Sequence, residues 1–127
     1  MSEAVLDASA VLAMMRNERG GASVRQLIRQ SIMSAVNLSE VLSKLIDYGA
    51  APESAREAVS ALPCKVEPFD LDQALAAGKM RTRARETGLS LGDRACLALA
   101  EARDLPAVTA DTRWNAFQST VEIRQLR

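Results

Sequence analysis

The chain has 127 residues, of which 48% are hydrophobic and 25% charged, as expected for one globular domain. Its 16 basic and 16 acidic side chains cancel, so any attraction to nucleic acid or to a membrane must be local. The chain contains no histidine, which excludes Ser-His-Asp triads, histidine general bases and histidine-bearing zinc sites.

The two cysteines, Cys64 and Cys96, lie far apart without a C-x-x-C spacing, and two thiols alone cannot complete a tetrahedral zinc site. No charged-then-apolar leader opens the sequence, and no apolar run approaches the roughly 20 residues of a membrane span. We therefore expect a reduced, cytoplasmic setting.

Hydrophobic periodicity predicts strands that alternate with helices. The predicted strands are 3–6, 31–36, 65–67, 106–109 and 120–124. The predicted helices are 9–17, 22–30, 38–48, 52–62, 70–87 and 91–103. This alternation indicates a single α/β domain over residues 1–127, with a mainly parallel sheet covered on both faces.

Three acidic residues follow predicted strands. Asp7 comes after the first strand, Glu40 lies in the first turn of the predicted helix after the second, and Asp111 stands two residues past 106–109. Because strand-to-helix junctions of a parallel sheet open on the same edge, we expect these three carboxylates to converge there. Asp93 occupies the first turn of a helix that no strand directly precedes, so the pattern alone does not place it.

Each acid also has a purely structural interpretation as a helix cap. Asn37-x-x-Glu40 and Ser90-x-x-Asp93 both resemble capping boxes, and Asp7 and Asp111 could be simple N-caps. A cluster is harder to explain by capping, because two carboxylates ~4 Å apart repel by about 4 kcal/mol at an effective dielectric near 20. Oxygen ligands without nitrogen or sulfur favour magnesium or manganese as the neutralising cation.

Four segments of the chain resemble one known family. "VLDASAVLA", "SAVNLSEVLSKL", "GLSLGDRACLALA" and "LPAVTADTRW" stand in the order and spacing of PIN-domain ribonucleases, and among these of the VapC toxins of bacterial toxin–antitoxin pairs. The resemblance covers nearly the whole chain and implies a three-layer α/β/α sandwich. It also implies Mg²⁺- or Mn²⁺-dependent hydrolysis of RNA by metal-activated water. The acidic pocket that it implies is built by Asp7, Glu40, Asp93 and Asp111.

The same resemblance implies partners. VapC relatives are held silent by an adjacent VapB-type antitoxin, are usually homodimers, and cut transfer or ribosomal RNA. The alternative is a PIN-fold module that has kept its shape as a catalytically silent binding or scaffolding domain. The presence of all four acids disfavours that alternative.

Three further polar residues are candidates for orienting the acids. Ser9 and Thr109 stand two residues from Asp7 and Asp111 and could hydrogen-bond to their carboxylates. Helix capping for Ser9 and strand propensity for Thr109 are equally good explanations. Asn37 could also reach the site, although capping explains it better.

Basic residues near the acids are candidates for binding RNA phosphate. Arg94 and Arg113 lie next to or near proposed ligands. The segment "GKMRTRARETG" contains two like-charged i, i+4 pairs, Lys79 with Arg83 and Arg81 with Arg85, which an anionic partner would relieve. A solvated, basic helix end is the alternative.

Two other magnesium-dependent families fit less well. A two-component receiver domain would show adjacent acids after the first strand and a lysine after the last, whereas Asp7 stands alone and the chain ends in "EIRQLR". A haloacid dehalogenase phosphatase would have a second aspartate two residues after Asp7, where this chain has Ser9.

Overall fold

The computed structural model describes residues 2–127, and five short strands form its central sheet. The sheet has the order β3-β2-β1-β4-β5, and every neighbouring pair is parallel. The strands are β1 (Ala4–Leu6), β2 (Ser31–Ser34), β3 (Lys65–Glu67), β4 (Ala107–Thr109) and β5 (Ile123–Gln125). Parallel strands need crossover connections, and helices supply most of them.

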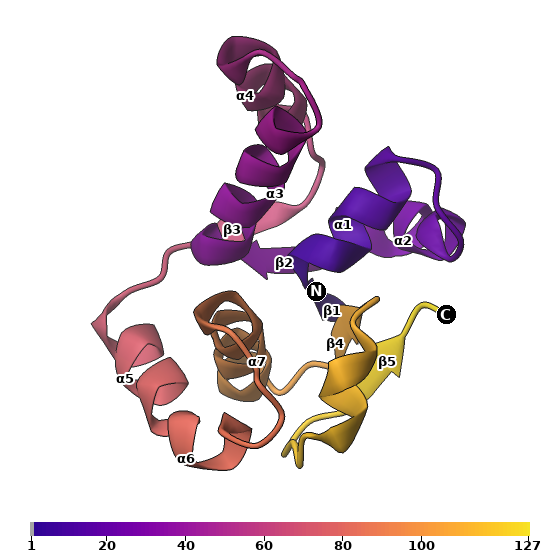
Figure 1. The fold of residues 1–127 in the computed structure, drawn as a ribbon. Coiled ribbons are helices and arrows are strands. Elements are labelled where there is room, and N and C mark those ends of the chain that lie inside the picture. The colour runs from indigo at the N-terminus through magenta and orange to yellow at the C-terminus, as the bar shows by residue number, and fades with distance from the viewer. Residues whose placement is uncertain (1) are drawn as a thin grey trace.

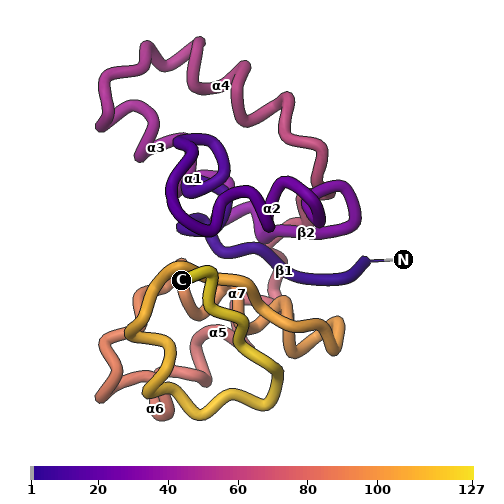
Figure 2. The backbone as a smooth tube through the Cα atoms, turned by 90° about the vertical axis from the view of Figure 1, so that its right-hand side faces the viewer, coloured from indigo at the N-terminus to yellow at the C-terminus, as the bar shows by residue number. Residues whose placement is uncertain are grey.

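Helices cover both faces of the sheet and make three layers (Figures 1 and 2). One layer holds α1 (Ala8–Met15), α2 (Gly21–Leu27), α3 (Ala35–Asp47) and α4 (Pro52–Ser60). The other holds α5 (Leu71–Lys79), α6 (Arg81–Ala84) and α7 (Leu91–Arg103). Two 3₁₀ turns, η1 (Ile28–Gln30) and η2 (Thr112–Ala116), complete the described elements. None of the helices in residues 2–127 is both long and apolar enough to cross a bilayer.

The core is divided by the sheet into two hydrophobic clusters. Along β1, Ala4 and Leu6 point to the cluster that contains α1, α2 and α3, whereas Val5 points to the cluster built around α7. All three side chains are fully buried. Side chains of a strand alternate between faces, so a strand buried on both sides is apolar throughout, as β1 is.

The predicted architecture is confirmed, with shifts at several element ends. Residues 65–67 and 91–103 have the predicted bounds. The predicted strand 31–36 ends at Ser34, and the predicted strand 120–124 is displaced to Ile123–Gln125. The helix predicted over 22–30 ends in η1.

The predicted continuous helix over 70–87 is wrong. It breaks after Lys79, and α6 is a separate four-residue helix. Two carbonyls of the last turn of α5 are taken by side chains, since Arg94 donates Nη1 to the Ala77 carbonyl (2.9 Å) and Thr82 donates Oγ1 to the Lys79 carbonyl (3.2 Å). These bonds satisfy carbonyls at the end of α5 that lack partners within the helix.

Of the two predicted capping boxes, one is confirmed and one is wrong. Ser90 and Asp93 form a reciprocal capping box at the start of α7, with Ser90 N donating to Asp93 Oδ2 (2.8 Å) and Asp93 N donating to Ser90 Oγ (3.2 Å). Ser34 is the N-cap of α3, because β2 ends earlier than predicted. Asn37 is therefore inside the helix and does not cap it.

Candidate metal and catalytic site

All four predicted acids line one pocket of about 220 Å³. Asp7 directly follows β1 and Asp111 follows β4 by two residues, so both lie at the carboxyl edge of the sheet. Glu40 comes from the second turn of α3 and Asp93 from the first turn of α7, and these two helices pack against each other. Four remote segments therefore contribute one carboxylate each to the same pocket.

Asp7 is the most buried of these acids, with 4% of its surface exposed. By position it is the N-cap of α1, yet its side chain makes no capping hydrogen bond. Instead Oδ2 accepts the hydroxyls of Ser9 (2.6 Å) and Thr109 (3.0 Å). The pKa of Asp7 is raised to about 6, chiefly by burial and also by the charges of Asp93 and Glu40, and the hydroxyls of Ser9 and Thr109 oppose this rise.

Ser9 and Thr109 tie the two sheet-edge acids together. Thr109 Oγ1 also accepts the backbone N–H of Asp111 (3.0 Å), and Ser9 Oγ accepts the N–H of Ala110 (2.9 Å). Thr109 is fully buried. Both side chains lie where the sequence placed them, in direct contact with a candidate ligand.

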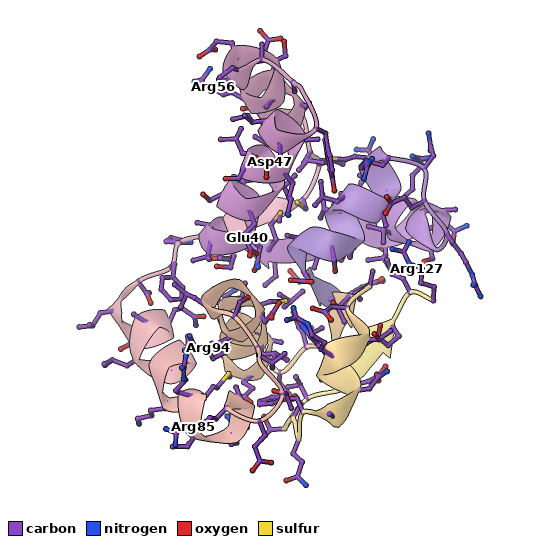
Figure 3. The ribbon with its side chains drawn as sticks, in the orientation of Figure 1. Glu40, Asp47, Arg56, Arg85, Arg94 and Arg127 are labelled. Carbon is purple, nitrogen blue, oxygen red and sulfur yellow. The ribbon has the colours of Figure 1, made fainter. Side chains whose placement is uncertain are left out.

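Glu40 is oriented by Asn37 and accommodated by Gly92. Asn37 Nδ2 donates to Glu40 Oε1 (2.9 Å) and to the Gly92 carbonyl (3.0 Å), and thereby links α3 to α7. A β-carbon at Gly92 would overlap the Glu40 carboxylate. Burial and the charge of Asp93 raise the pKa of Glu40, while Asn37 and Lys44 lower it. In Figure 3, Glu40 lies at the lower end of α3, above α7.

Asp111 is held by Arg113. Its Oδ1 accepts the backbone N–H of Arg113 (2.9 Å), and Arg113 Nη2 donates to its Oδ2 (2.6 Å). These hydrogen bonds hold the pKa of Asp111 below its usual range. The same Nη2 lies 3.6 Å from Oδ2 of Asp93. Arg113 thus lines the acidic pocket, where the sequence expected a phosphate-binding arginine.

The donor chemistry of this pocket fits magnesium or manganese, since every candidate ligand is a carboxylate oxygen. Burial first, and then the charge of Asp93, raise the pKa of both Asp7 and Glu40, as expected for carboxylates crowded into one pocket. The four acids do not form a coordination shell in this structure. Within residues 2–127, no three Cys, Asp or Glu side chains are arranged so that they could hold a metal ion together.

The remaining basic candidates lie away from this pocket. Arg94 is buried at 9% exposure and turns to the opposite side of α7, where it binds the Ala77 carbonyl (Figure 3). The prediction that Arg94 grips phosphate in the pocket is therefore wrong in placement. Arg83 pairs with Glu101 (3.4 Å) and lies over the ring of Phe117. Lys79 is exposed at the end of α5, outside the pocket lining.

Sequence reasoning missed two residues at the site. Lys44 lines the pocket one helical turn after Glu40, and the i, i+4 spacing from Glu to Lys was the available signal. Gly92 was signalled by its place in the first turn of α7, because glycine is a poor helix former and is used where space is short.

Comparison with known proteins identifies the family. The profile of the PIN domain matches residues 4–119. The chain belongs to the PIN-domain family. A sequence search among curated proteins gives no significant match. The three-layer fold of this PIN domain is also found in solved structures of low sequence identity.

Three of these structures show how far the likeness extends. A chain of the DNA-bound VapBC complex from Salmonella typhimurium is 17% identical, with a TM-score of 0.77 and full coverage of both chains. A chain of FitAcB from Neisseria gonorrhoeae is 20% identical, with a TM-score of 0.74 and 97% coverage of each chain. VapC20 of Mycobacterium tuberculosis, a Sarcin-Ricin loop cleaving toxin, is 17% identical with a TM-score of 0.71, covering 91% of this chain and 97% of its own.

Proposed function

We propose that this PIN domain is a divalent-metal-dependent endoribonuclease and the toxin component of a toxin–antitoxin pair. The main support is that four separate segments each contribute one carboxylate to the same pocket. The pKa of one of these acids, the buried Asp7, is raised to about 6. Burying mutually repelling carboxylates destabilises a fold unless a ligand neutralises them. Mg²⁺ or Mn²⁺ matches the oxygen-only donor set, and RNA matches the family resemblance.

The four acids share one part in this proposal, and three neighbouring polar residues orient two of them. Asp7, Glu40, Asp93 and Asp111 would hold the ion or orient the attacking water. When bound, such an ion supplies a water of lowered pKa and neutralises charge that develops on the phosphoryl oxygens. Ser9 and Thr109 fix the rotamer of Asp7, and Asn37 fixes that of Glu40. Such fixing matters because a misplacement of about 1 Å costs roughly 100-fold in rate.

Cleavage of RNA by the purified protein tests the proposal. The wild-type chain should cut transfer or ribosomal RNA with Mg²⁺ or Mn²⁺ and lose this activity with a chelator. Asp7→Asn should be inactive, whereas the exposed Asp47, shown in Figure 3 on α3 away from the pocket, should tolerate the same change. Equal cleavage by wild type and Asp7→Asn, or none with either metal, would support the silent scaffolding module instead.

The partners of this PIN domain are proposals of the same kind. Solved relatives of similar fold come from toxin–antitoxin complexes, which supports a VapB-type antitoxin. Growth arrest on expression, relieved by the neighbouring gene, would test that partnership in the cytoplasm.

We also propose a homodimer. Exposed leucines on α5 and at the start of α7 support an apolar interface, namely Leu71 (73%), Leu75 (57%) and Leu91 (51%). Light scattering of wild type and Leu75→Lys tests it, with the variant expected to be monomeric.

A further inference from the structure

Arg113 places a positive charge among the candidate metal ligands. Its Nε lies 3.1 Å from both carboxylate oxygens of Asp111, and its Nη2 lies 2.6 Å from Asp111 Oδ2. Nη2 is also 3.6 Å from Asp93 Oδ2, and Nη1 is 3.4 Å from the Gly88 carbonyl. One guanidinium therefore pairs with one acid of the pocket and approaches a second.

This pairing engages both oxygens of Asp111. Oδ1 accepts the backbone N–H and Nε of Arg113, while Oδ2 accepts Nε and Nη2. Charge-assisted, forked bonds of this kind are among the stronger hydrogen bonds of proteins. A divalent ion that used Asp111 as a ligand would have to share or displace these donors. The same arrangement explains why the acids line one pocket without forming a ready coordination shell.

The guanidinium can leave without disturbing the core. The Arg113 side chain is 57% exposed, and its neighbour Trp114, which is fully buried, anchors the backbone of η2. Rotation of the Arg113 side chain would break only the bonds to Asp111, Asp93 and Gly88. Such a movement is a change of rotamer rather than of fold.

We propose that Arg113 is an internal counterion that competes with the divalent cation for Asp111 and Asp93 and must withdraw from Asp111 when the ion binds. This inference rests on the proposed metal site. It makes Arg113 a residue that sets metal affinity, and it ascribes to Arg113 two positions, one with and one without the ion. A competing Arg113 lowers the affinity of the pocket for the metal, whereas an arginine that positioned Asp111 for the metal would raise it.

Mn²⁺ binding to the full chain distinguishes these roles. Arg113→Ala should bind Mn²⁺ roughly 3- to 10-fold more tightly than wild type in calorimetry, since a partly exposed pair contributes modestly to the competition. Arg113→Lys, which keeps the charge but loses the fork, should lie between them. Arg124→Ala is the matched control, because Arg124 also pairs through Nε with an acid two residues away, Glu122, outside the pocket. It should bind Mn²⁺ as the wild type does.

The outcomes separate the inference from the proposed function. Equal or weaker binding by Arg113→Ala than by a wild type that binds Mn²⁺ overturns the inference and leaves the metal site intact. If Arg113→Ala binds Mn²⁺ and the wild type does not, the inference is supported, because Arg113 then prevents binding altogether. Failure of both proteins to bind overturns the metal site and the inference together.

A second measurement needs no folded variant. The Nε–H signal of Arg113 in the ¹⁵N spectrum of the wild type should shift when Mg²⁺ is added, and that of Arg124 should not. A signal of Arg113 that is unchanged at saturating Mg²⁺ contradicts the withdrawal of its side chain.

Discussion

The Cα of Gly92 lies directly against the carboxylate of Glu40, so that a β-carbon at position 92 would overlap that carboxylate. This contact joins the N-terminal turn of α7 to α3 and leaves no room for a side chain at position 92 while Glu40 keeps its place. Because the obstructed group is the end of a flexible side chain, a larger residue at 92 would move Glu40 rather than unfold the domain.

We therefore expect Gly92→Ala to fold and to lose catalysis. Alanine is a better helix former than glycine, and this gain offsets the cost of moving Glu40. The free energy of unfolding of Gly92→Ala should therefore be close to that of wild type. The displaced Glu40 should lower RNA cleavage by about 100-fold. Gly78→Ala in α5 is the control, since a β-carbon there meets no atom within 4 Å. It should raise the free energy of unfolding by about 0.5–1 kcal/mol and leave cleavage unchanged.

Asp7→Asn should stabilise the metal-free protein at neutral pH. The pKa of Asp7 is raised to about 6 in the folded state from 3.8, so the native state holds its proton more tightly than the unfolded chain does. Native stability is therefore lost as the pH rises from about 4 through 6, by at most about 3 kcal/mol. Asparagine avoids this loss. Urea unfolding at pH 4 and pH 7 measures it, and Asp47→Asn should show no such gain. If Asp7→Asn is no more stable than wild type at pH 7, the ionised Asp7 side chain does not lower the free energy of unfolding, which contradicts this prediction.

Thr109→Val should destabilise the domain and impair the site. Valine has a similar shape but cannot donate to Asp7 or accept from the Asp111 backbone, and position 109 is fully buried. Loss of these bonds should lower the free energy of unfolding by about 1–3 kcal/mol. The pKa of Asp7 should rise further without these bonds. As the pH is lowered, Mn²⁺ binding by the variant should therefore weaken at a higher pH than Mn²⁺ binding by the wild type. The exposed Thr120 offers a control, and an unchanged pH profile in Thr109→Val would contradict the assigned bonds.

Arg94→Ala should affect stability rather than RNA binding. Arg94 is buried and bonds to the Ala77 carbonyl, so truncation leaves that acceptor unpaired and removes packing between α5 and α7. We expect a loss of about 1–3 kcal/mol in the free energy of unfolding. The salt dependence of RNA binding should be that of wild type. The exposed Arg85 gives the comparison, since Arg85→Ala should leave stability nearly unchanged. A reduced salt dependence in Arg94→Ala would return Arg94 to the phosphate-binding residues.

The sequence predicted best what depends on chain order along the sheet. Asp7 and Asp111 could be placed at the site because both follow strands of a parallel sheet, and that edge is shared. Asp93 could not be placed in this way, because α5 and α6 separate its helix from the preceding strand. Only the family resemblance supplied it. The packing of α7 against α3 that brings Asp93 to the pocket is a long-range contact that periodicity does not encode.

Two errors concern residues of helices, and they arise from helix phase for Arg94 and from a helix boundary for Asn37. Arg94 is adjacent to Asp93 in sequence, but successive helical residues point about 100° apart, so one faces the pocket and the other faces α5. Asn37 was read as a cap because β2 was expected to extend to residue 36. With the cap at Ser34, Asn37 instead faces α7 from inside the helix.

Anomalous scattering from crystals grown with Mn²⁺ would show whether Asp7, Glu40, Asp93 and Asp111 bind a divalent cation. We expect a manganese peak in the pocket, bonded to oxygens of Asp7 and of at least one of the other three acids, with the Arg113 guanidinium moved off Asp111. Wild-type crystals with no peak there, at a Mn²⁺ concentration that supports RNA cleavage, would contradict it.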